Sequence, residues 1–299
     1  MKHLIITLGD PYGIGPEVTF KALKKAGAIK AEITVIGDIA AFKTFGTLKQ
    51  KINYIDIKSR YGAPKKAEPS KRGGDISFKA LNTAVNLALK TKNSALVTAP
   101  ISKEAWQKAG VNYMGHTEFL REKAALDGAL MMFKSGALIC GLVTEHYALK
   151  DLSKAITKQR IKTAAKLLAA TLPKGALTEV SALNPHAGDG GKIGKEELKT
   201  IIPAVKELQK AGLNIQGPYP VDSIWLRHTQ GKSKAILMMY HDAALLGLKL
   251  AAKEPVIHIT AGLKFLRVSP AHGTAFDIAG TNTADEASML SAIKYALGK

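Results

Sequence analysis

Residues 3–27 read HLIITLGDPYGIGPEVTFKALKKAG. An apolar run rich in β-branched residues ends in a loop of glycine, aspartate and proline, and a segment with helical spacing follows. This order predicts a β-strand, a polar loop at the carboxyl end of that strand, and an α-helix.

The alternation of strand and helix continues along the chain. Further strands are predicted at residues 31–38, 94–100, 136–145, 180–185, 234–242 and 255–262, and helices at residues 40–49, 77–90, 153–171 and 195–212. Residues 60–75 are polar and contain two prolines and three glycines, which predicts a mobile connection. The pattern is typical of an α/β protein with a mostly parallel sheet.

The composition excludes several classes of protein. Of the 299 residues 46% are hydrophobic, as in ordinary globular proteins, and no apolar run is long enough to span a membrane. The first residues lack the apolar segment of a secretory signal. The single cysteine, Cys140, excludes an internal disulfide and a cysteine-built metal cluster. We therefore expect a cytoplasmic protein.

The formal charge of +19 could indicate binding to nucleic acid or to an anionic membrane. The excess is lysine, however, with 37 lysines against 6 arginines, and the lysines are spread along the whole chain. Arginine is the favoured residue for bidentate contacts to phosphate and guanine. We expect a lysine-rich solvated surface, with no nucleic-acid or membrane partner and with enough charge for an anionic small substrate.

Six loops at the ends of the predicted strands are rich in Gly, Pro, His, Asp or Thr. They read LGDPYGIGPE, VTAPISK, VTEHYALKD, ALNPHAGDGG, MMYHDAALLGLK and VSPAHGTAFDIAG. Ligand sites of open α/β sheets lie outside the carboxyl ends of the strands. The loops therefore predict an enzyme or a small-ligand binder, whereas a structural protein would not need them.

Five of the eight histidines lie in or near these loops: His116, His146, His186, His241 and His272. Three neutral imidazoles from separate strand ends could hold one divalent cation with open positions, as catalytic sites do. Each histidine could equally well hold its own loop by hydrogen bonding. The carboxylates of Asp151, Asp189 and Asp242 could fix the imidazole tautomers by accepting a hydrogen bond from the ring nitrogen that does not bind the metal.

The glycine-rich loops differ in what they indicate. GDPYGIGPE lacks the third glycine of the dinucleotide fingerprint, and it could be only a turn that starts a helix. NPHAGDGG could bring backbone amides to an anion or could be only flexible. In AHGTAFDIAGTNTAD, the carboxylate of Asp277 next to backbone amides suits the two hydroxyls of a ribose.

The motifs GDPYGIGPEV, TAPISK, GHTEFL, TEHYALKDLSKAIT, LNPHAGDGG, GPYPVDS, MMYHD and HGTAFDIAG occur in this order. Together they resemble the 4-hydroxythreonine-4-phosphate dehydrogenase family of pyridoxal phosphate biosynthesis, over essentially the whole chain. The resemblance implies a two-lobed fold like that of isocitrate and isopropylmalate dehydrogenases, with a cleft between the lobes. It also implies a cofactor-side lobe of residues 1–115 and 255–299, a metal-binding and dimerisation lobe of residues 116–254, and a homodimer with shared active sites.

The resemblance also implies a role for each matching residue. His146, His186 and His241 correspond to ligands of one divalent metal (Zn, Co or Mg), with His241 from one subunit and the other two from its partner. Lys103 and Asp242 are the candidate catalytic groups. Substrate contacts correspond to His116, Thr117, Lys249, His258 and Arg267. The adenosine of NAD would be held by His272, Gly273, Thr274, Ala275, Asp277 and Gly280, and the carboxylate of Asp277 would repel the extra phosphate of NADP.

The implied reaction is metal-dependent oxidation by NAD, with decarboxylation, of 4-phosphohydroxy-L-threonine to 3-amino-2-oxopropyl phosphate. A metal would favour loss of the hydroxyl proton, and cationic side chains would bind the phosphate. The chain departs from the family pattern at Ala243, His258, Lys264 and Ala271, and Tyr12 replaces a common small residue.

These departures keep alternatives open. The nearest is a dehydrogenase of 4-phospho-D-threonate or 4-phospho-D-erythronate in the same family. More distant alternatives are a family member that binds ligand without turnover and a metal-dependent phosphatase, which would not need HGTAFDIAG.

Overall fold

The computed structural model describes residues 1–298, without the side chains of residues 126 and 127. The chain divides into two compact units, residues 1–126 with 257–299 and residues 127–256. The expected boundary at residues 115/116 lies earlier than the one in the structure, because helix α5 packs against α3 of the first unit. None of the described helices is long and apolar enough to cross a membrane.

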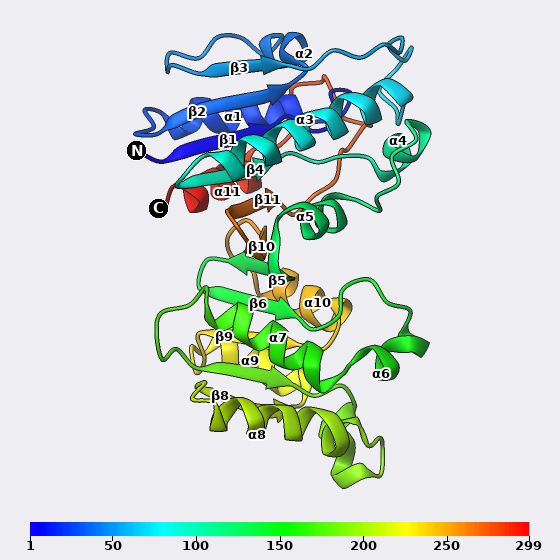
Figure 1. The fold of residues 1–299 in the computed structure, drawn as a ribbon, viewed down its shortest axis with the longest axis vertical. Coiled ribbons are helices and arrows are strands. Elements are labelled where there is room, and N and C mark those ends of the chain that lie inside the picture. Colours follow the sequence, from blue (N-terminus) through cyan, green and yellow to red (C-terminus); the bar gives the residue numbers. More distant parts are fainter. Residues whose placement is uncertain (299) are drawn as a thin grey trace. The chain divides into compact units, whose positions relative to one another are not determined.

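The first unit contains six strands and six helices among its described residues, drawn in blue, cyan and orange to red in Figure 1. Its elements are β1 (His3–Thr7), α1 (Gly15–Ala26), β2 (Glu32–Gly37), α2 (Ile39–Lys43), β3 (Asn53–Asp56), α3 (Lys71–Lys90), β4 (Ser94–Thr98), α4 (Lys103–Lys108), α5 (His116–Ala124), β10 (Ile257–Leu263), β11 (Leu266–Pro270) and α11 (Ala287–Leu297). The strand order is β3-β2-β1-β4-β11-β10, with only the β10–β11 pair antiparallel.

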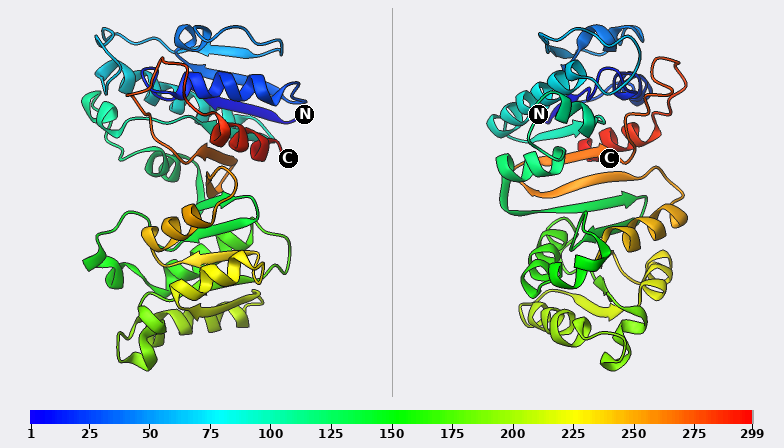
Figure 2. Two further views of the ribbon diagram at one scale, coloured as in Figure 1. Left: turned by 180° about the vertical axis from the view of Figure 1, so that it is seen from behind. Right: turned by 90° about the vertical axis from the view of Figure 1, so that its right-hand side faces the viewer.

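Helices cover both faces of this part of the sheet. Helix α3 lies against β1, β2 and β4, whereas α1 and α11 pack together on the other face (Figure 2). All five residues of β1 and of β4 are buried, as expected for central strands of a parallel sheet. Pro16 in the first turn and Gly27 after the last turn set the ends of α1.

The second unit repeats the layered arrangement. Its elements are β5 (Ala125–Ser135, which begins at the boundary), β6 (Leu138–Leu142), the 3₁₀ helix η1 (Leu149–Asp151), α6 (Leu152–Ala155), α7 (Lys158–Ala169), β7 (Thr178–Ser181), the 3₁₀ segment η2 (Pro185–Gly191), the π-helix η3 (Glu197–Ile201), α8 (Ile202–Lys210), β8 (Ile215–Tyr219), α9 (Val221–Thr229), β9 (Ala235–Met238) and α10 (His241–Ala251). The strand order is β5-β6-β9-β7-β8, with β5–β6 antiparallel and the other pairs parallel. Helices α7 and α8 pack together, as do α9 and α10 on the opposite face (Figures 1 and 2).

The α/β class and the mostly parallel sheet are therefore confirmed, and three local predictions are corrected. Residues 71–75 are helical rather than part of a mobile connection, because Ser70 caps α3 by accepting a hydrogen bond from the amide of Gly73. The helix predicted at residues 40–49 ends at Lys43. The helix predicted at residues 195–212 begins with a π-helical turn.

Candidate active site

In the first unit, three neighbouring parallel strands end in polar loops. Strands β1, β4 and β11 lie in the order β1-β4-β11 and carry GDPYGIGPE, APISK and AHGTAFDIAG at their carboxyl ends. Because parallel neighbours end at the same edge of a sheet, these loops emerge side by side. This part of the sheet holds the predicted residues Lys103, His116, Thr117, His258, Arg267 and His272–Gly280.

Arg267 is the central charged group of this edge. Its side chain is 2% exposed, yet none of the carboxylates that the structure describes forms an ion pair with it. Its guanidinium donates hydrogen bonds to Oγ1 of Thr98 (2.7 Å) and Oγ1 of Thr260 (3.1 Å), and Nε has no partner. Burial lowers the pKa of Arg267 to about 9, so the group remains charged at pH 7. A buried, uncompensated guanidinium favours binding of an anion.

His258 is the third partner of Arg267. Nη1 of Arg267 donates a hydrogen bond to Nδ1 of His258 (2.9 Å). Because an arginine has no acceptor, Nδ1 of His258 must be unprotonated, and the neutral ring carries its proton on Nε2. His258 therefore fixes the orientation of Arg267 from β10.

His116 and Lys103 lie at the starts of α5 and α4. Burial, and secondarily the charge of Arg267, lower the pKa of His116 well below its usual value, so the imidazole is neutral at pH 7. Its Nε2 atom is buried without a hydrogen-bond partner. The stem of Lys103 is close to Gly115, since a Cβ added there would lie 3.6 Å from Cε of Lys103. Thr117 is half-buried in the same first turn of α5.

The segment 271–286, which includes the residues His272–Gly280 predicted to bind the adenosine, contains no helix or strand. Asp277 is exposed and has no hydrogen bond or ion pair to any residue that the structure describes. Ala275 and Gly280 have left-handed backbones, with φ of 41° and 81°. Nε2 of His272 is buried without a hydrogen-bond partner. An exposed carboxylate and an unsatisfied imidazole on one segment suit the polar groups of a nucleotide.

In the second unit, the strand order β6-β9-β7 places three more polar loops at one edge. They carry His146, His241 and His186, respectively. The rings of His146 and His241 lie together, with centroids 5.3 Å apart and planes tilted by 38°. Both histidines belong to one chain here, whereas the family resemblance distributes them over two subunits.

Asp242 supports His241 directly. Because β9 ends at Met238 and His241 already begins α10, the two neighbouring side chains can turn toward each other. Nδ1 of His241 lies 2.8 Å from Oδ1 of Asp242. A carboxylate on Nδ1 fixes the tautomer that presents Nε2 to a ligand, as in many metal sites.

His186 occupies a strained turn. Five consecutive residues, 186–190, have positive φ angles between 43° and 80°, and three of them are not glycine. The buried carboxylate of Glu197 holds the start of this turn, because Oε1 accepts hydrogen bonds from the amides of Leu183 (2.9 Å) and Asn184 (2.8 Å). Such strain persists only where surrounding contacts enforce it, and it is concentrated at functional sites.

His146, His186 and His241 are therefore side chains of a type that can bind a divalent cation. Two imidazoles lie side by side, one of them supported by a carboxylate, and a third is held on a neighbouring loop. The described part of the chain does not bring three metal-ligating side chains into one group. Lys249 is exposed on α10, about two helical turns after His241.

A family model described as "Pyridoxal phosphate biosynthetic protein PdxA" matches residues 12–296. The chain belongs to this family. Relatives from this family align with the chain over nearly its full length. A 4-hydroxythreonine-4-phosphate dehydrogenase from Synechocystis is 37% identical and covers 99% of this chain and 95% of its own. A D-threonate 4-phosphate dehydrogenase from Salmonella typhimurium is 33% identical, and the alignment covers 99% of this chain and 98% of that protein.

Among solved structures, 4-hydroxythreonine-4-phosphate dehydrogenase from Klebsiella pneumoniae superposes with a TM-score of 0.87 at 32% identity, covering 100% of this chain and 99% of that one. The predicted PdxA-family resemblance is therefore confirmed, and the chain is a dehydrogenase of this family. The relatives carry two different substrate names, so family membership does not choose between the substrates.

Sequence reasoning in this PdxA-family chain missed the residues that hold the predicted ones in place. Thr98 and Thr260 are strand residues whose hydroxyls fix Arg267, and nothing in their local sequence marks them. Glu17 and Glu197 are 1% exposed, and because glutamate is rarely buried, the residue type alone predicts the opposite. His3 and His228, which lie outside the six loops, are bound within the core by Thr34 and by the amide of Ile139.

Proposed function

We propose that this chain catalyses the NAD-dependent oxidation and decarboxylation of 4-phosphohydroxy-L-threonine to 3-amino-2-oxopropyl phosphate, a step of pyridoxal 5'-phosphate biosynthesis. The observation that supports this most directly is the buried guanidinium of Arg267, which has no carboxylate partner among the described residues and lies near the neutral imidazole of His116. A phosphate or carboxylate of the substrate would provide the missing negative charge.

The chain's own groups would divide the work of binding. Arg267 would bind an anionic group of the substrate through its unsatisfied Nε, while Thr98, Thr260 and His258 hold its other nitrogens. Lys249 would add a second cation. His116 and Thr117 would donate or accept hydrogen bonds at the polar groups of the substrate. Binding the remote charge would orient the carbon that is oxidised.

The cofactor and the metal would supply the redox chemistry. When bound, NAD accepts the hydride, and a divalent cation (Zn, Co or Mg) supplies positive charge where the hydroxyl loses its proton. His146, His186 and His241 would hold the cation, with Asp242 fixing the tautomer of His241. Asp277 would accept hydrogen bonds from the ribose hydroxyls, and Lys103, near His116, would orient the substrate or exchange a proton with it.

We also propose a homodimer with shared active sites. Three leucines on the adjoining helices α9 and α10 are exposed, with Leu226 at 61%, Leu246 at 66% and Leu250 at 80%. An apolar group of this kind favours burial against a second copy. Light scattering would test the dimer: Leu250→Glu should shift the mass from dimer toward monomer, and a monomeric wild type would contradict it.

A second substrate is favoured by a specific observation. Relatives named for D-threonate 4-phosphate are as similar to this chain as several named for 4-hydroxythreonine 4-phosphate, at 33–34% against 34–37% identity. His258, one of the positions at which the chain departs from the family pattern, contacts Arg267 directly. 4-Phospho-D-threonate or 4-phospho-D-erythronate is therefore the alternative substrate for the same site.

The test is NADH formation by the purified protein with NAD and a divalent metal, offered each of the three phosphorylated compounds in turn. Turnover of 4-phosphohydroxy-L-threonine, abolished by a chelator and by His241→Ala, is the expected result. Turnover of the sugar acids alone would transfer the proposal to the alternative substrate. Release of inorganic phosphate without NADH would indicate a phosphatase and contradict both.

Arg267→Lys tests the residue on which the proposal depends. The shorter, compact ammonium cannot bond Thr98, Thr260 and the substrate anion together, so KM for the substrate should rise by about 30-fold. Arg160→Lys, at an exposed arginine of α7, is the matched control and should change KM by less than about twofold. An unchanged KM in Arg267→Lys would show that Arg267 does not bind the substrate.

A further inference from the structure

The loop GDPYGIGPE has no part in the chemistry proposed above, yet it contacts the segment assigned to the nucleotide. It joins β1 to α1, and its residues touch the segment 274–284 at both ends. We refer to 274–284 as the nucleotide loop. Both contacts lie within the first unit.

The first contact fastens the start of the nucleotide loop. The amide of Ile14 donates a hydrogen bond to the carbonyl of Thr274 (2.9 Å). Gly13 lies so close to Thr274 that a Cβ added to it would be 2.8 Å from the same carbonyl oxygen. Only glycine allows the two backbones to approach in this way.

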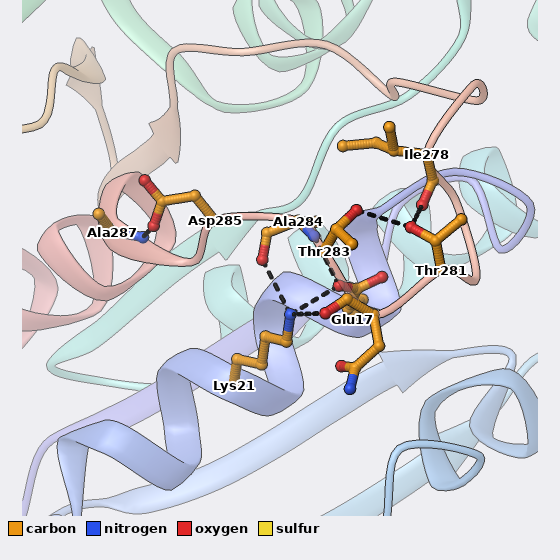
Figure 3. Close-up of polar contacts among 9 residues, drawn as sticks. Glu17, Lys21, Ile278, Thr281, Thr283, Ala284, Asp285 and Ala287 are labelled. Atoms are coloured by element: carbon orange, nitrogen blue, oxygen red, sulfur yellow. Dashed lines mark hydrogen bonds and ion pairs between the residues drawn. The ribbon is translucent and has the colours of Figure 1, made fainter.

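The second contact fastens the end of the loop through a buried ion pair, shown in Figure 3. Oε1 of Glu17 accepts hydrogen bonds from the amide of Ala284 (2.8 Å) and from Nζ of Lys21 (2.7 Å). The same ammonium donates to the carbonyls of Asn282 (2.8 Å) and Ala284 (3.0 Å). The Glu17 side chain is 1% exposed and that of Lys21 is 24% exposed, so solvent screens the pair weakly.

Between these two contacts, the hydrogen bonds of the loop to other described residues are all short-range bonds within the loop itself. Oγ1 of Thr281 donates to the carbonyl of Ile278 (2.7 Å) and lies 2.7 Å from Oγ1 of Thr283 (Figure 3). The stretch that carries Asp277 and Gly280 is itself neither helix nor strand. Its conformation therefore depends on where its two ends are held.

We propose that Glu17 and Lys21 are positioning residues that hold the nucleotide loop in the conformation that receives the adenosine of NAD. The inference deepens the proposed function and rests on it. A loop released at one end samples many conformations, and NAD must then bind the small fraction that is competent. The apparent dissociation constant rises by the reciprocal of that fraction. The substrate groups on β4, β11 and α5 keep their contacts.

The experiment measures NADH affinity without turnover, by titration of the cofactor's fluorescence. Lys21→Met removes both carbonyl contacts and the cation, and should weaken NADH binding by about tenfold. Lys21→Arg keeps the charge and should recover most of the affinity. Lys25→Met is the matched control: it lies one turn further along α1, and its ion pair with Glu286 (2.8 Å) lies beyond the nucleotide loop. It should change the affinity by less than about twofold.

Two further readouts separate positioning from a general structural effect. In Lys21→Met, KM for NAD should rise while KM for the phosphorylated substrate stays within about twofold of wild type. Hydrogen exchange without cofactor should show a faster amide at Ala284 and an unchanged core of β1 and β4.

Several outcomes would overturn the inference. Equal NADH affinity in wild type and Lys21→Met would remove the positioning role and leave the proposed function intact. An equal loss in Lys25→Met would assign the effect to general destabilisation of α1. A wild type that binds no NADH would contradict the proposed function, and this inference with it.

Discussion

Two loops in different units, residues 183–191 and residues 274–284, are each held at one end by a buried glutamate. Glu197 holds the first and Glu17 the second, and each side chain is 1% exposed. In each unit a carboxylate from the adjoining helical segment accepts hydrogen bonds from loop amides that would otherwise have no partner.

The two glutamates differ in what compensates their charge. Glu197 accepts only from neutral donors, two backbone amides and Nδ2 of Asn184 (2.9 Å). Glu17 accepts from one backbone amide and from the ammonium of Lys21. A buried carboxylate can thus be satisfied either by several amides or by one cation with fewer amides.

The loops also differ in backbone strain. Residues 186–190 form an unbroken left-handed run, whereas the loop 274–284 has left-handed residues only at Ala275, Gly280 and Asn282. Glu197 accepts more hydrogen bonds than Glu17, and the loop that it holds is the more strained of the two. In this chain, the glutamate with several amide donors supports the strained loop, while the glutamate paired with a cation supports the relaxed one.

The largest expected effect is that of Glu197→Ala. It leaves two half-buried amides and the side chain of Asn184 without their acceptor, so the free energy of unfolding should fall by about 3 kcal/mol, measured by urea denaturation. Glu17→Ala removes fewer hydrogen bonds and should cost about 2 kcal/mol by the same measure. Glu196→Ala is the control, because Glu196 is only half-buried and touches Asn184 from the side, and it should cost less than about 1 kcal/mol. A larger loss in Glu17→Ala than in Glu197→Ala would reverse the comparison.

A third buried carboxylate, that of Asp10, accepts a hydrogen bond from only one backbone amide among the described residues. Its Oδ1 accepts from the amide of Tyr12 (3.1 Å), Oδ2 has no partner, and burial raises its pKa from 3.8 to about 6. Because the folded pKa lies above the unfolded one, the folded state loses stability as the pH rises from about 4 to about 6. Asp10→Asn stays neutral, so it should be more stable than wild type by about 2 kcal/mol at pH 8 and equal to it at pH 4.

Thermal denaturation of Asp10→Asn at both pH values checks this sign. Asp222→Asn, at an exposed aspartate in the first turn of α9, is the matched control and should lower stability slightly at pH 8. A gain for Asp10→Asn that is the same at pH 4 and pH 8 would show that ionisation of Asp10 is not its source.

The smallest expected effect concerns the strained loop itself. Ala187 has a φ of 54°, which a glycine adopts without steric cost, so Ala187→Gly should stabilise the protein by about 0.5 kcal/mol after the entropy of the unfolded glycine is deducted. Ala204→Gly in the middle of α8 should instead destabilise it by about 1 kcal/mol. If both substitutions destabilise the protein equally, residues 186–190 are not strained.

The strand-end loops were predictable because strand and helix periodicities alternate along the chain. The start of α3 was not. Gly73 and Gly74 suggest a loop locally, but they lie in the helix capped by Ser70. They are glycine because a side chain at Gly73 would meet Asp10, and one at Gly74 would lie 2.0 Å from the carbonyl of Ala105. That requirement comes from residues distant in sequence, which a local pattern does not contain.

The candidate site likewise contains some residues that the sequence predicted and others that it could not reveal. His146 and His241 were predicted from loop position and motif, and the structure brings them together. The residues that orient the site, such as Thr98 behind Arg267, depend on the register of β4 with β11, which pairs Arg267 with Leu96. Register is a tertiary property, so no spacing along one strand could reveal it.

The discontinuity of the first unit has a consequence for synthesis of the chain. Strand β11, which pairs with β4 in that unit's strand order, and the loop held by Glu17 both belong to the part of the chain that is made after the second unit. The second unit, residues 127–256, is continuous and can fold while the ribosome is still translating. The N-terminal strands must wait for the C-terminal segment to emerge. The segment assigned to NAD is thus made only after the whole of the second unit.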